Sequence, residues 1–495
     1  MKFNKLSASV VEKLEKAVGR EYITTNKVIR YSYLSKGIMG LDAIPPEAVV
    51  RPKEVSEVQE ILQIANEHQI PVTPAAGGLS GGFALPQIEP AGILLDLSRM
   101  DNIVEVDTDN RYLIVESGVR TGAVWAYFRK YYPEWAPPVP DGAPPSATIL
   151  GDAIERGFSL VTGAFGPQAD LIMGLEIVLP NGDLFRTGSW ALSEGGNGFK
   201  PFYRWGAGPN FDGLFLGSQG TMGIVTKAAI RIVPHPHAKT IVVYGHSSID
   251  AVQDAALRVM KYELGIADNL VMVQGGNWPL VMTRWPELKV PKDYQFYQKL
   301  GIPEWWQNFE IWAHSDEELE FIKKRIAEEM ERFGEETGNH PVQQQLHPKQ
   351  IASRLKKPNL IAIPYALYRG GFLFITWYTP WNESAEMSKY YVSKMEEFGI
   401  PPVIWIASID HGRQAIVMPI VCFDSTDPAS IEKVRELDRV TSEYCYNQGW
   451  LNYRPNPKIH APLMWERAPT YFKYLKAMKN LLDPNGILHP GRLGF

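Results

Sequence analysis

The 495-residue chain lacks the features that mark several large protein classes. It has two cysteines, Cys422 and Cys445, which are too few for a disulfide framework and are spaced like no zinc site, so we expect free thiols. No stretch reaches the roughly 18 uninterrupted apolar residues of a membrane-spanning helix. The N-terminus, MKFNKLSASVVEKLEKAV, has no apolar core of a signal peptide. These absences predict a cytoplasmic protein.

Charge of neither sign dominates. Fifty Lys and Arg residues face 55 Asp and Glu residues, and the net charge of −5 is spread without long runs. This balance speaks against nucleic acid or a membrane surface as a partner. The length suggests roughly three domains, and no internal repeat or low-complexity segment interrupts the chain.

Aromatic residues, in contrast, are plentiful. There are 14 Trp, 22 Tyr and 20 Phe, and many follow residue 270. Most such residues belong to hydrophobic cores, but an aromatic second half also suits a pocket for a planar organic substrate.

Helical and strand patterns alternate up to about residue 235. Apolar residues recur at helical spacing from Val55 to Ala65, and a second helical pattern covers 121–132. The run DTDN joins two apolar strands in the manner of a hairpin. This order predicts an α+β unit, with strands at 70–74, 92–97, 102–106 and 112–119.

The pattern changes after the proline- and histidine-bearing segment 233–240. Three helical stretches alternate with apolar strand-like runs, which predicts a second α+β domain. The segment 270–310 has little periodicity, and we expect it to be a loop with a functional or partner-binding role. Helices are predicted at 251–264, 316–333 and 431–445, and strands at 370–378, 402–408 and 415–423.

Three glycine clusters stand out, at 75–82, 151–166 and 217–226. The first, AAGGLSGG, follows a strand, and its glycines let several backbone N–H groups approach a pyrophosphate. It is not the G-x-G-x-x-G dinucleotide fingerprint. A tight structural turn explains any single cluster equally well, but three in this order are far more specific.

The strings AAGGLSGG, ILGDAIERG, GLEIVLPNGDLFRTG and GPNFDGLFLGSQGTMGIVT resemble the FAD-binding domain of the vanillyl-alcohol oxidase and p-cresol methylhydroxylase family. The first loop is also similar to that of glycolate and D-lactate dehydrogenases. The resemblance implies an α+β fold with a two-part FAD-binding PCMH-type domain over 1–238 and an α+β cap over 239–450. A C-terminal segment, 451–495, would return to the flavin domain.

By this resemblance the glycine clusters hold FAD, and Arg492 brings a positive charge to the flavin ring. Such a charge would stabilise anionic reduced flavin. The implied cofactor-binding residues are Ala76, Gly77, Gly78, Leu79, Ser80, Gly81, Pro140, Ser146, Gly151, Gly157, Thr162, Gly220, Gly223, Ile224 and Arg492.

The segment GWLNYRPNP resembles the part of the family in which a Tyr-Arg pair holds a phenolate oxygen, here Tyr453 and Arg454. A cation beside a hydroxyl would lower the pKa of a bound phenol and stabilise the quinone methide formed by hydride loss. Alternatively, Tyr453 is a core aromatic and Arg454 makes a structural ion pair.

Two further residues are catalytic candidates. Asp141 resembles the family's aspartate near flavin N5, which can act as a base, although an Asp before Gly is also a common turn former. His411, beside Asp410, could accept a proton or be structural. Other pocket candidates are Tyr365, Tyr368, Arg369, Trp377, Trp405, Asp410 and Arg413.

Non-covalent FAD is expected. Covalent relatives often carry His in the first glycine loop, where this chain has Leu79 and Ser80. Phe372 stands at a second attachment position and cannot bond to the flavin. Ser80 also replaces a phenolate-binding tyrosine of the family, which argues against a simple 4-hydroxybenzyl substrate.

The predicted function is an FAD-dependent oxidase or dehydrogenase that oxidises an aromatic alcohol or alkylphenol by hydride transfer to flavin N5. A D-2-hydroxy-acid dehydrogenase is the alternative, but no H-x-x-x-G-x-x-H metal site accompanies His411 or His460, and we expect no metal. A non-catalytic electron-transfer subunit is a third possibility. The electron acceptor is open between oxygen, a cytochrome, a quinone and a flavoprotein, and a homodimer or larger homo-oligomer is expected.

Overall fold

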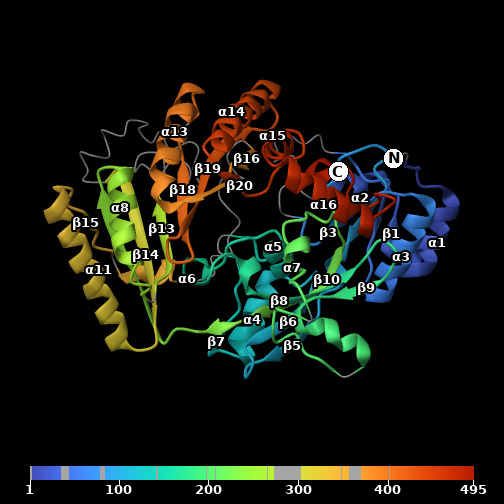
Figure 1. Ribbon diagram of the computed structural model, residues 1–495, viewed down its shortest axis with the longest axis horizontal. Coiled ribbons are helices and arrows are strands. Elements are labelled where there is room, and N and C mark those ends of the chain that lie inside the picture. The colour runs from blue at the N-terminus through green and yellow to red at the C-terminus, as the bar shows by residue number, and fades with distance from the viewer. Residues whose placement is uncertain are drawn as a thin grey trace.

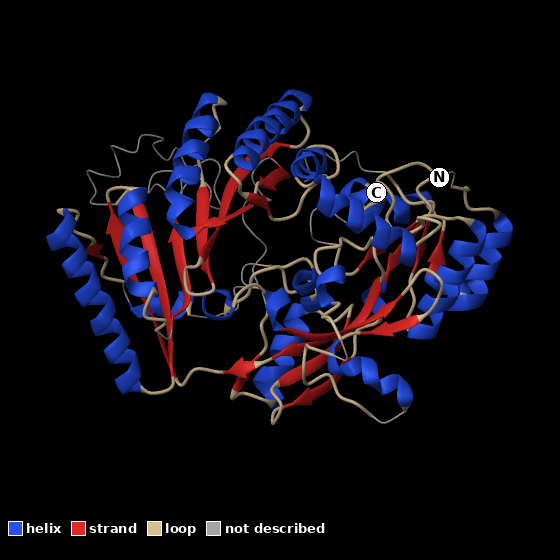
Figure 2. Ribbon diagram, viewed as in Figure 1, coloured by secondary structure: helices blue, strands red, loops and turns tan. Residues whose placement is uncertain are grey.

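The computed structural model describes residues 3–34, 44–78, 84–140, 143–196, 198–206, 208–264, 266–272, 303–346, 348–355, 370–400 and 402–495. A four-stranded and a five-stranded sheet lie on one side of the molecule, and a large sheet backed by long helices lies on the other (Figures 1 and 2). The predicted α+β class is confirmed, and both chain termini lie on the side of the smaller sheets (Figure 1).

The first sheet has the order β1 (Ile23–Thr24), β2 (Ala48–Val50), β4 (Ile93–Asp96) and β3 (Val72–Ala75), with the last three parallel. Helix α3 (Val55–His68) begins with a capping box between Glu54 and Glu57 and buries one apolar face. It shares a core with α1 (Ala8–Val18) and with the sheet. This unit places the first glycine cluster directly after β3.

The second sheet is antiparallel, in the order β5 (Ile103–Asp107), β6 (Tyr112–Glu116), β10 (Ile224–Arg231), β8 (Ile172–Val178) and β9 (Leu184–Arg186). The predicted hairpin between β5 and β6 is confirmed. The helix predicted at 121–132 is α4 (Thr121–Tyr131), and its Val124 and Phe128 share a core with the sheet.

The large sheet joins β15, β12, β14, β13, β18, β19, β17 and β20 in that order, and β16 also pairs with β19. Helices α8, α11, α13 and α14 pack against it (Figure 1). The strands are β12 (Ala238–His246), β13 (Ile266–Met272), β14 (Trp305–Ala313), β15 (Val342–Gln343), β16 (Gly370–Phe374), β17 (Trp377–Pro380), β18 (Ile404–Ile409), β19 (Gln414–Asp424) and β20 (Leu451–Asn452); the helices are α8 (Ile249–Met260), α11 (Asp316–Thr337), α13 (Ser384–Glu397) and α14 (Pro428–Asn447).

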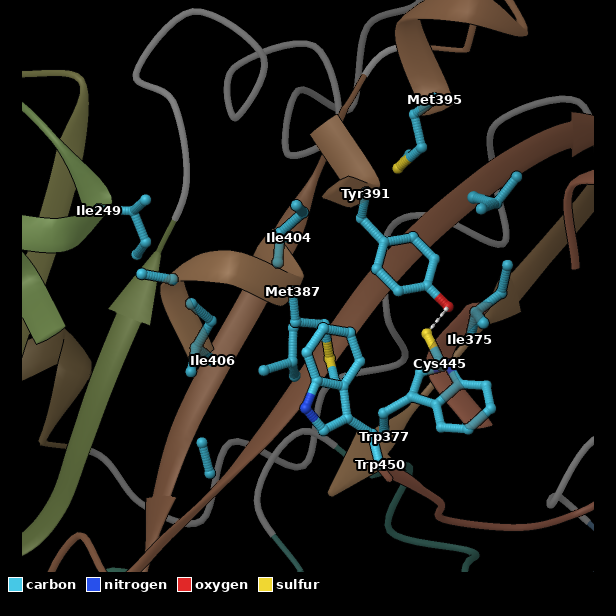
Figure 3. Packing of buried hydrophobic residues seen from close by; sticks show 14 of the residues in the cluster. Ile249, Ile375, Trp377, Met387, Tyr391, Met395, Ile404, Ile406, Cys445 and Trp450 are labelled. Atoms are coloured by element: carbon cyan, nitrogen blue, oxygen red, sulfur yellow. Dashed lines mark hydrogen bonds between the residues drawn. The ribbon is translucent and has the colours of Figure 1, made fainter. Parts of the chain in front are cut away.

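Strand alternation gives this sheet two different apolar faces. Trp377, Ile404 and Ile406 point into the core beneath the helices, where the free thiol Cys445 contacts the Tyr391 hydroxyl (Figure 3). Ala407 and Ile416 lie on the opposite face, in a cluster with Tyr453.

Three expectations about the second half need correction. The run 370–378 is two strands, β16 and β17, with different pairing. The expected loop at 270–310 has strands at both ends, because β13 and β14 pair within the large sheet, and 273–302 lies outside the described residues. Helix α13 was not predicted, because its sequence is rich in polar residues and aromatics that blur the helical period.

The C-terminal segment returns to the first glycine-rich half. Helices α15 (His460–Arg467) and α16 (Pro469–Leu482) precede a bridge in which Val72 donates to the Ile487 carbonyl and His489 donates to the Val72 carbonyl, both at 2.8 Å. The buried Lys479 ammonium donates to the Thr221 carbonyl at 2.7 Å and pairs with Asp483. The exact domain boundaries at 238 and 450 stay a prediction.

Candidate active site

The first two glycine clusters meet backbone to backbone. A Cβ on Gly77 would lie 3.3 Å from the Thr148 nitrogen, and one on Gly151 would lie 2.6 Å from Thr148 Oγ1 and 3.6 Å from the Cβ of Ala76. Gly78 has φ +65° and faces open space. Only residues without a side chain allow this approach.

The third cluster lies against the end of β3, the strand that the first cluster follows. Gly220 has φ +75°, and a Cβ there would meet Pro74 Cγ at 2.4 Å, just before the first cluster. Its neighbour Gln219 contacts the C-terminal segment through its carbonyl, 2.8 Å from His489 Nδ1, and through its side chain, which accepts from Arg492 Nε. The three clusters and Arg492 are therefore gathered in one place.

The gathered loops fit a dinucleotide cofactor such as FAD. Gly77 and Gly78 are exposed, so their backbone is open to a pyrophosphate. Burial lowers the pKa of Arg492 to about 9, against the opposing effect of Glu155. Leu79, Ser80 and Gly81 lie outside the described residues.

The remaining predicted cofactor residues take different positions. Pro140 is buried and Ser146 is exposed, and both precede the second cluster in the sequence. Thr162 Oγ1 accepts from the Ser159 backbone at 2.7 Å. Gly223 precedes β10, and Ile224, its first residue, is buried in the core of the first sheet. Direct contacts of these residues with FAD stay predictions.

Tyr453 and Arg454 form a compact polar cluster with Asp152 of α5 (Ile149–Ile154). Arg454 Nη2 donates to the Tyr453 hydroxyl at 2.7 Å and to Asp152 Oδ1 at 3.2 Å. The Arg454 guanidinium also lies over the Tyr453 ring, 4.4 Å from its centroid. The cluster thus holds a cation and a hydroxyl side by side, directly beside the second glycine cluster.

Asp152 is a largely buried carboxylate, and one of its two oxygens lacks a hydrogen-bond partner among the described residues. Burial raises its pKa to about 6, although Arg454 opposes this. Oδ2 has no hydrogen-bond partner among the described residues. A Cβ on Gly157 would lie 2.1 Å from this oxygen, so Gly157 makes room for the carboxylate. The structure thereby gives the predicted cofactor residue Gly157 a role toward Asp152.

Arg156 and Tyr378 hold this cluster against the large sheet. Arg156 Nη2 donates to the Tyr453 carbonyl at 2.6 Å, and the Tyr378 hydroxyl donates to the Arg156 carbonyl at 3.1 Å. The Tyr378 and Tyr453 rings meet edge to face at 5.5 Å. Neither residue was predicted from the sequence, because their partners are more than 200 positions away.

The sheet face toward this cluster is aromatic. Phe158 packs on Trp405 with ring centroids 4.8 Å apart, and both join the apolar cluster around Tyr453. Trp405, a predicted pocket residue, therefore lies near Tyr453. Trp377 alternates with Tyr378 along β17 and lies in the core on the opposite face (Figure 3), which corrects its assignment to the pocket.

His411 and Asp410 form the tight turn between β18 and β19, and both have positive φ. The His411 backbone donates to the Gly163 carbonyl at 2.7 Å, and that of Asp410 donates to the Thr162 carbonyl at 3.2 Å. The turn thereby docks the large sheet on the second glycine region. A catalytic role for the His411 side chain stays a prediction.

The remaining predicted residues bond to groups other than the Tyr453–Arg454 pair or lie outside the described residues. His460 is buried, with Nε2 between Asp438 and Ser442, which indicates a structural role. Arg413 is exposed and pairs with Asp410. Asp141, Tyr365, Tyr368 and Arg369 and the side chain of Phe372 lie outside the described residues.

No described helix combines the length and apolarity that a membrane crossing requires. Within the same part of the chain, no three His, Cys, Asp or Glu side chains gather as metal ligands would.

Comparison with known proteins agrees with this geometry. The FAD binding domain family model matches residues 46–188. The 4-cresol dehydrogenase [hydroxylating] flavoprotein subunit of Pseudomonas putida is 26% identical over 91% of this chain and 88% of its own length. The glycolate oxidase subunit GlcD of Bacillus subtilis is 31% identical over 60% of this chain and 57% of its own.

A solved structure matches the whole fold. The 4-ethylphenol oxidase from Gulosibacter chungangensis superposes with a TM-score of 0.85 at 20% identity, covering 100% of this chain and 99% of the other. The chain is an FAD-dependent oxidoreductase with an FAD binding domain, and it is similar over nearly its whole length to the 4-cresol dehydrogenase flavoprotein subunit.

Proposed function

We propose that this protein oxidises a para-substituted phenol, an alkylphenol or a related aromatic alcohol, at the carbon attached to the ring. The observation that carries the proposal is the Tyr453–Arg454 pair, built as a hydroxyl and a guanidinium 2.7 Å apart. It lies beside the glycine clusters that fit FAD and against the aromatic sheet face of Trp405 and Phe158.

In this function the pair holds the substrate oxygen. Arg454 Nε has no hydrogen-bond partner among the described residues, so the guanidinium retains donors beyond those given to Tyr453 and Asp152. A cation and a hydroxyl at one oxygen favour phenolate over phenol and support the quinone methide that hydride loss creates. Phe158 and Trp405 offer apolar surface for the ring.

The three glycine clusters and Arg492 would hold FAD, which supplies the hydride acceptor when bound. We propose that it is held without a covalent bond, because Leu79 and Ser80 offer no histidine in the first loop. The flavin should therefore pass into the filtrate when the protein is denatured with acid. A flavin that stays with the precipitate would contradict this part of the proposal.

The rival function is oxidation of a D-2-hydroxy acid. Against it, the relative named for glycolate covers 60% of this chain, whereas the relative named for 4-cresol covers 91%. The described residues also bring together a phenolate-type pair and no group of metal ligands. These observations support a phenol, rather than a D-2-hydroxy acid, as the substrate.

The test is anaerobic reduction of the bound flavin, followed as bleaching of its visible absorbance. We expect para-alkylphenols and aryl alcohols to bleach it and D-lactate and glycolate to leave it unchanged. Bleaching by the hydroxy acids alone would establish the rival function, and bleaching by neither class would favour an electron-transfer subunit. Reoxidation by oxygen, a quinone or a cytochrome then identifies the acceptor.

The variant Arg454→Ala should lower the efficiency of flavin reduction by about 100-fold or more, since it removes the charged donor from the phenolate. The exposed Arg439 on α14, which pairs with Glu436 on its own helix, supplies the matched control Arg439→Ala. If Arg454→Ala lost its flavin but the residual holoenzyme reacted normally, the role of Arg454 would be structural.

A further inference from the structure

The Asp152 carboxylate lies next to the Tyr453–Arg454 pair, which we propose holds the substrate's phenolic oxygen. Its Oδ1 accepts from the same Arg454 nitrogen that binds the Tyr453 hydroxyl. Any phenol oxygen held by the Tyr453–Arg454 pair is therefore brought to the side of the Asp152 carboxylate.

The surroundings leave this carboxylate poorly stabilised as an anion. Oδ2 is buried and accepts no hydrogen bond from the described residues, although about a fifth of the side chain as a whole is exposed. An ionised carboxylate with an unsatisfied oxygen is a good proton acceptor. The charged and titratable groups that shift the pKa of Asp152 or of its neighbour Tyr453 are Arg454, Glu155, Tyr378 and Arg156.

The net charge of Asp152, Arg454 and a bound phenolate also favours a protonated Asp152. Ionised Asp152 already neutralises Arg454, whose side chain is only 16% exposed. A phenolate that joined this pair would leave a net negative charge in a buried place, which is costly. A proton on Asp152 removes that charge and frees Arg454 to pair with the phenolate.

We propose that Asp152 accepts the proton of the substrate's phenolic hydroxyl on binding, so that phenolate and neutral carboxyl occupy the site together. The O–H bond of the phenol breaks, an O–H bond forms at Asp152 Oδ1, and the total charge is unchanged. The proposal rests on the proposed function and names the residue that makes phenolate binding possible near neutral pH.

The raised pKa of Asp152, about 6 because of its burial, supports this role. A free phenol has a pKa near that of tyrosine, about 10. Tyr453 and Arg454 lower the pKa of the bound phenol, while burial makes the carboxyl more basic, and the two shifts bring donor and acceptor closer together.

The experiment counts protons on ligand binding to the holoenzyme. The probe is unsubstituted phenol, which has no para substituent to oxidise, and calorimetry in two buffers of different ionisation enthalpy gives the number of protons exchanged. In the wild type at pH 8 we expect none, because the proton moves from ligand to Asp152. Affinity should be flat from about pH 7 to 9.

The variant Asp152→Asn keeps the size of the side chain but cannot take the proton. It should release one proton per phenol bound, and its affinity should rise about tenfold per pH unit over the same range. The control Asp250→Asn makes the same change at an exposed aspartate of α8, which pairs with Lys389, and should behave as the wild type.

Release of a proton by the wild type at pH 8 would overturn the proposal, even if Asp152→Asn could not be purified. Asp152→Asn that binds phenol without releasing a proton would overturn it as well. Failure of the wild type to bind phenol, together with no bleaching by any alkylphenol, would instead remove the proposed function on which it rests.

Discussion

Replacing Lys479 by Met should destabilise the protein strongly, because Lys479 joins the C-terminal segment to the third glycine cluster. Its ammonium donates to the Thr221 carbonyl at 2.7 Å and to the Leu488 carbonyl at 3.1 Å, and it pairs with Asp483. The Lys479 and Asp483 side chains are 6% and 0% exposed. Methionine fills the space but leaves the Asp483 charge uncompensated.

The free energy of unfolding should fall by about 3–5 kcal/mol, the range for removing one partner of a buried ion pair. The low end applies if the Ile487 and Leu488 amides, which donate to Asp483 at 3.0 and 2.8 Å, keep it partly satisfied. Unfolding entropy is about 2.1 cal/mol/K per residue. For 495 residues that unfold together, 1 kcal/mol corresponds to about 1 °C.

The Tm of Lys479→Met should therefore fall by about 3–5 °C, measured by tryptophan fluorescence on the holoenzyme, and by more if the C-terminal segment unfolds as a smaller unit. FAD content should fall too, because Thr221 belongs to the third glycine cluster. The exposed Lys473 on the same helix supplies the control Lys473→Met. A Tm within 1 °C of the wild type would refute the reasoning.

Three further predictions concern the site. Gly157→Ala places a Cβ 2.1 Å from Asp152 Oδ2, so it should displace the carboxylate and slow flavin reduction while the visible spectrum of FAD remains. Gly220→Ala forces alanine to φ +75° and against Pro74, and the purified variant should contain less FAD per chain. Because burial raises the pKa of Asp152 from 3.8 to about 6, the folded state binds an extra proton between these values, and stability falls as pH rises through that window. Asp152→Asn should lose this decline, and equal pH slopes of Tm in variant and wild type would contradict it.

The sequence predicts much of the fold because its signals are local. The helical period of α3 and the DTDN hairpin depend on neighbours a few residues apart, and both are confirmed. The glycine clusters are recognisable for the same reason, since a backbone that must pass close to another backbone requires glycine at that position. Tyr453 and Arg454 were found through the family resemblance of a short string.

What the sequence does not reveal is pairing across long distances. Asp152 stands 302 positions from Arg454, and no period or motif connects them. Arg156 likewise bonds to Tyr453 across 297 positions. Both lie in a segment, ILGDAIERG, whose glycines indicate a cofactor, while its Asp152 and Arg156 contact the Tyr453–Arg454 pair.

The position of Arg156 has a consequence for how this protein can be re-engineered or can diversify. Its side chain binds the Tyr453 carbonyl, and its own carbonyl receives the Tyr378 hydroxyl. A chimera that took the large sheet from a relative and kept residues 1–238 of this chain would keep the Arg156 carbonyl but lose the Tyr378 hydroxyl unless the relative has a tyrosine at that position. New substrate ranges are therefore more readily reached by exchanging Trp405 and the segment 152–158 together than by transplanting the sheet as an independent module.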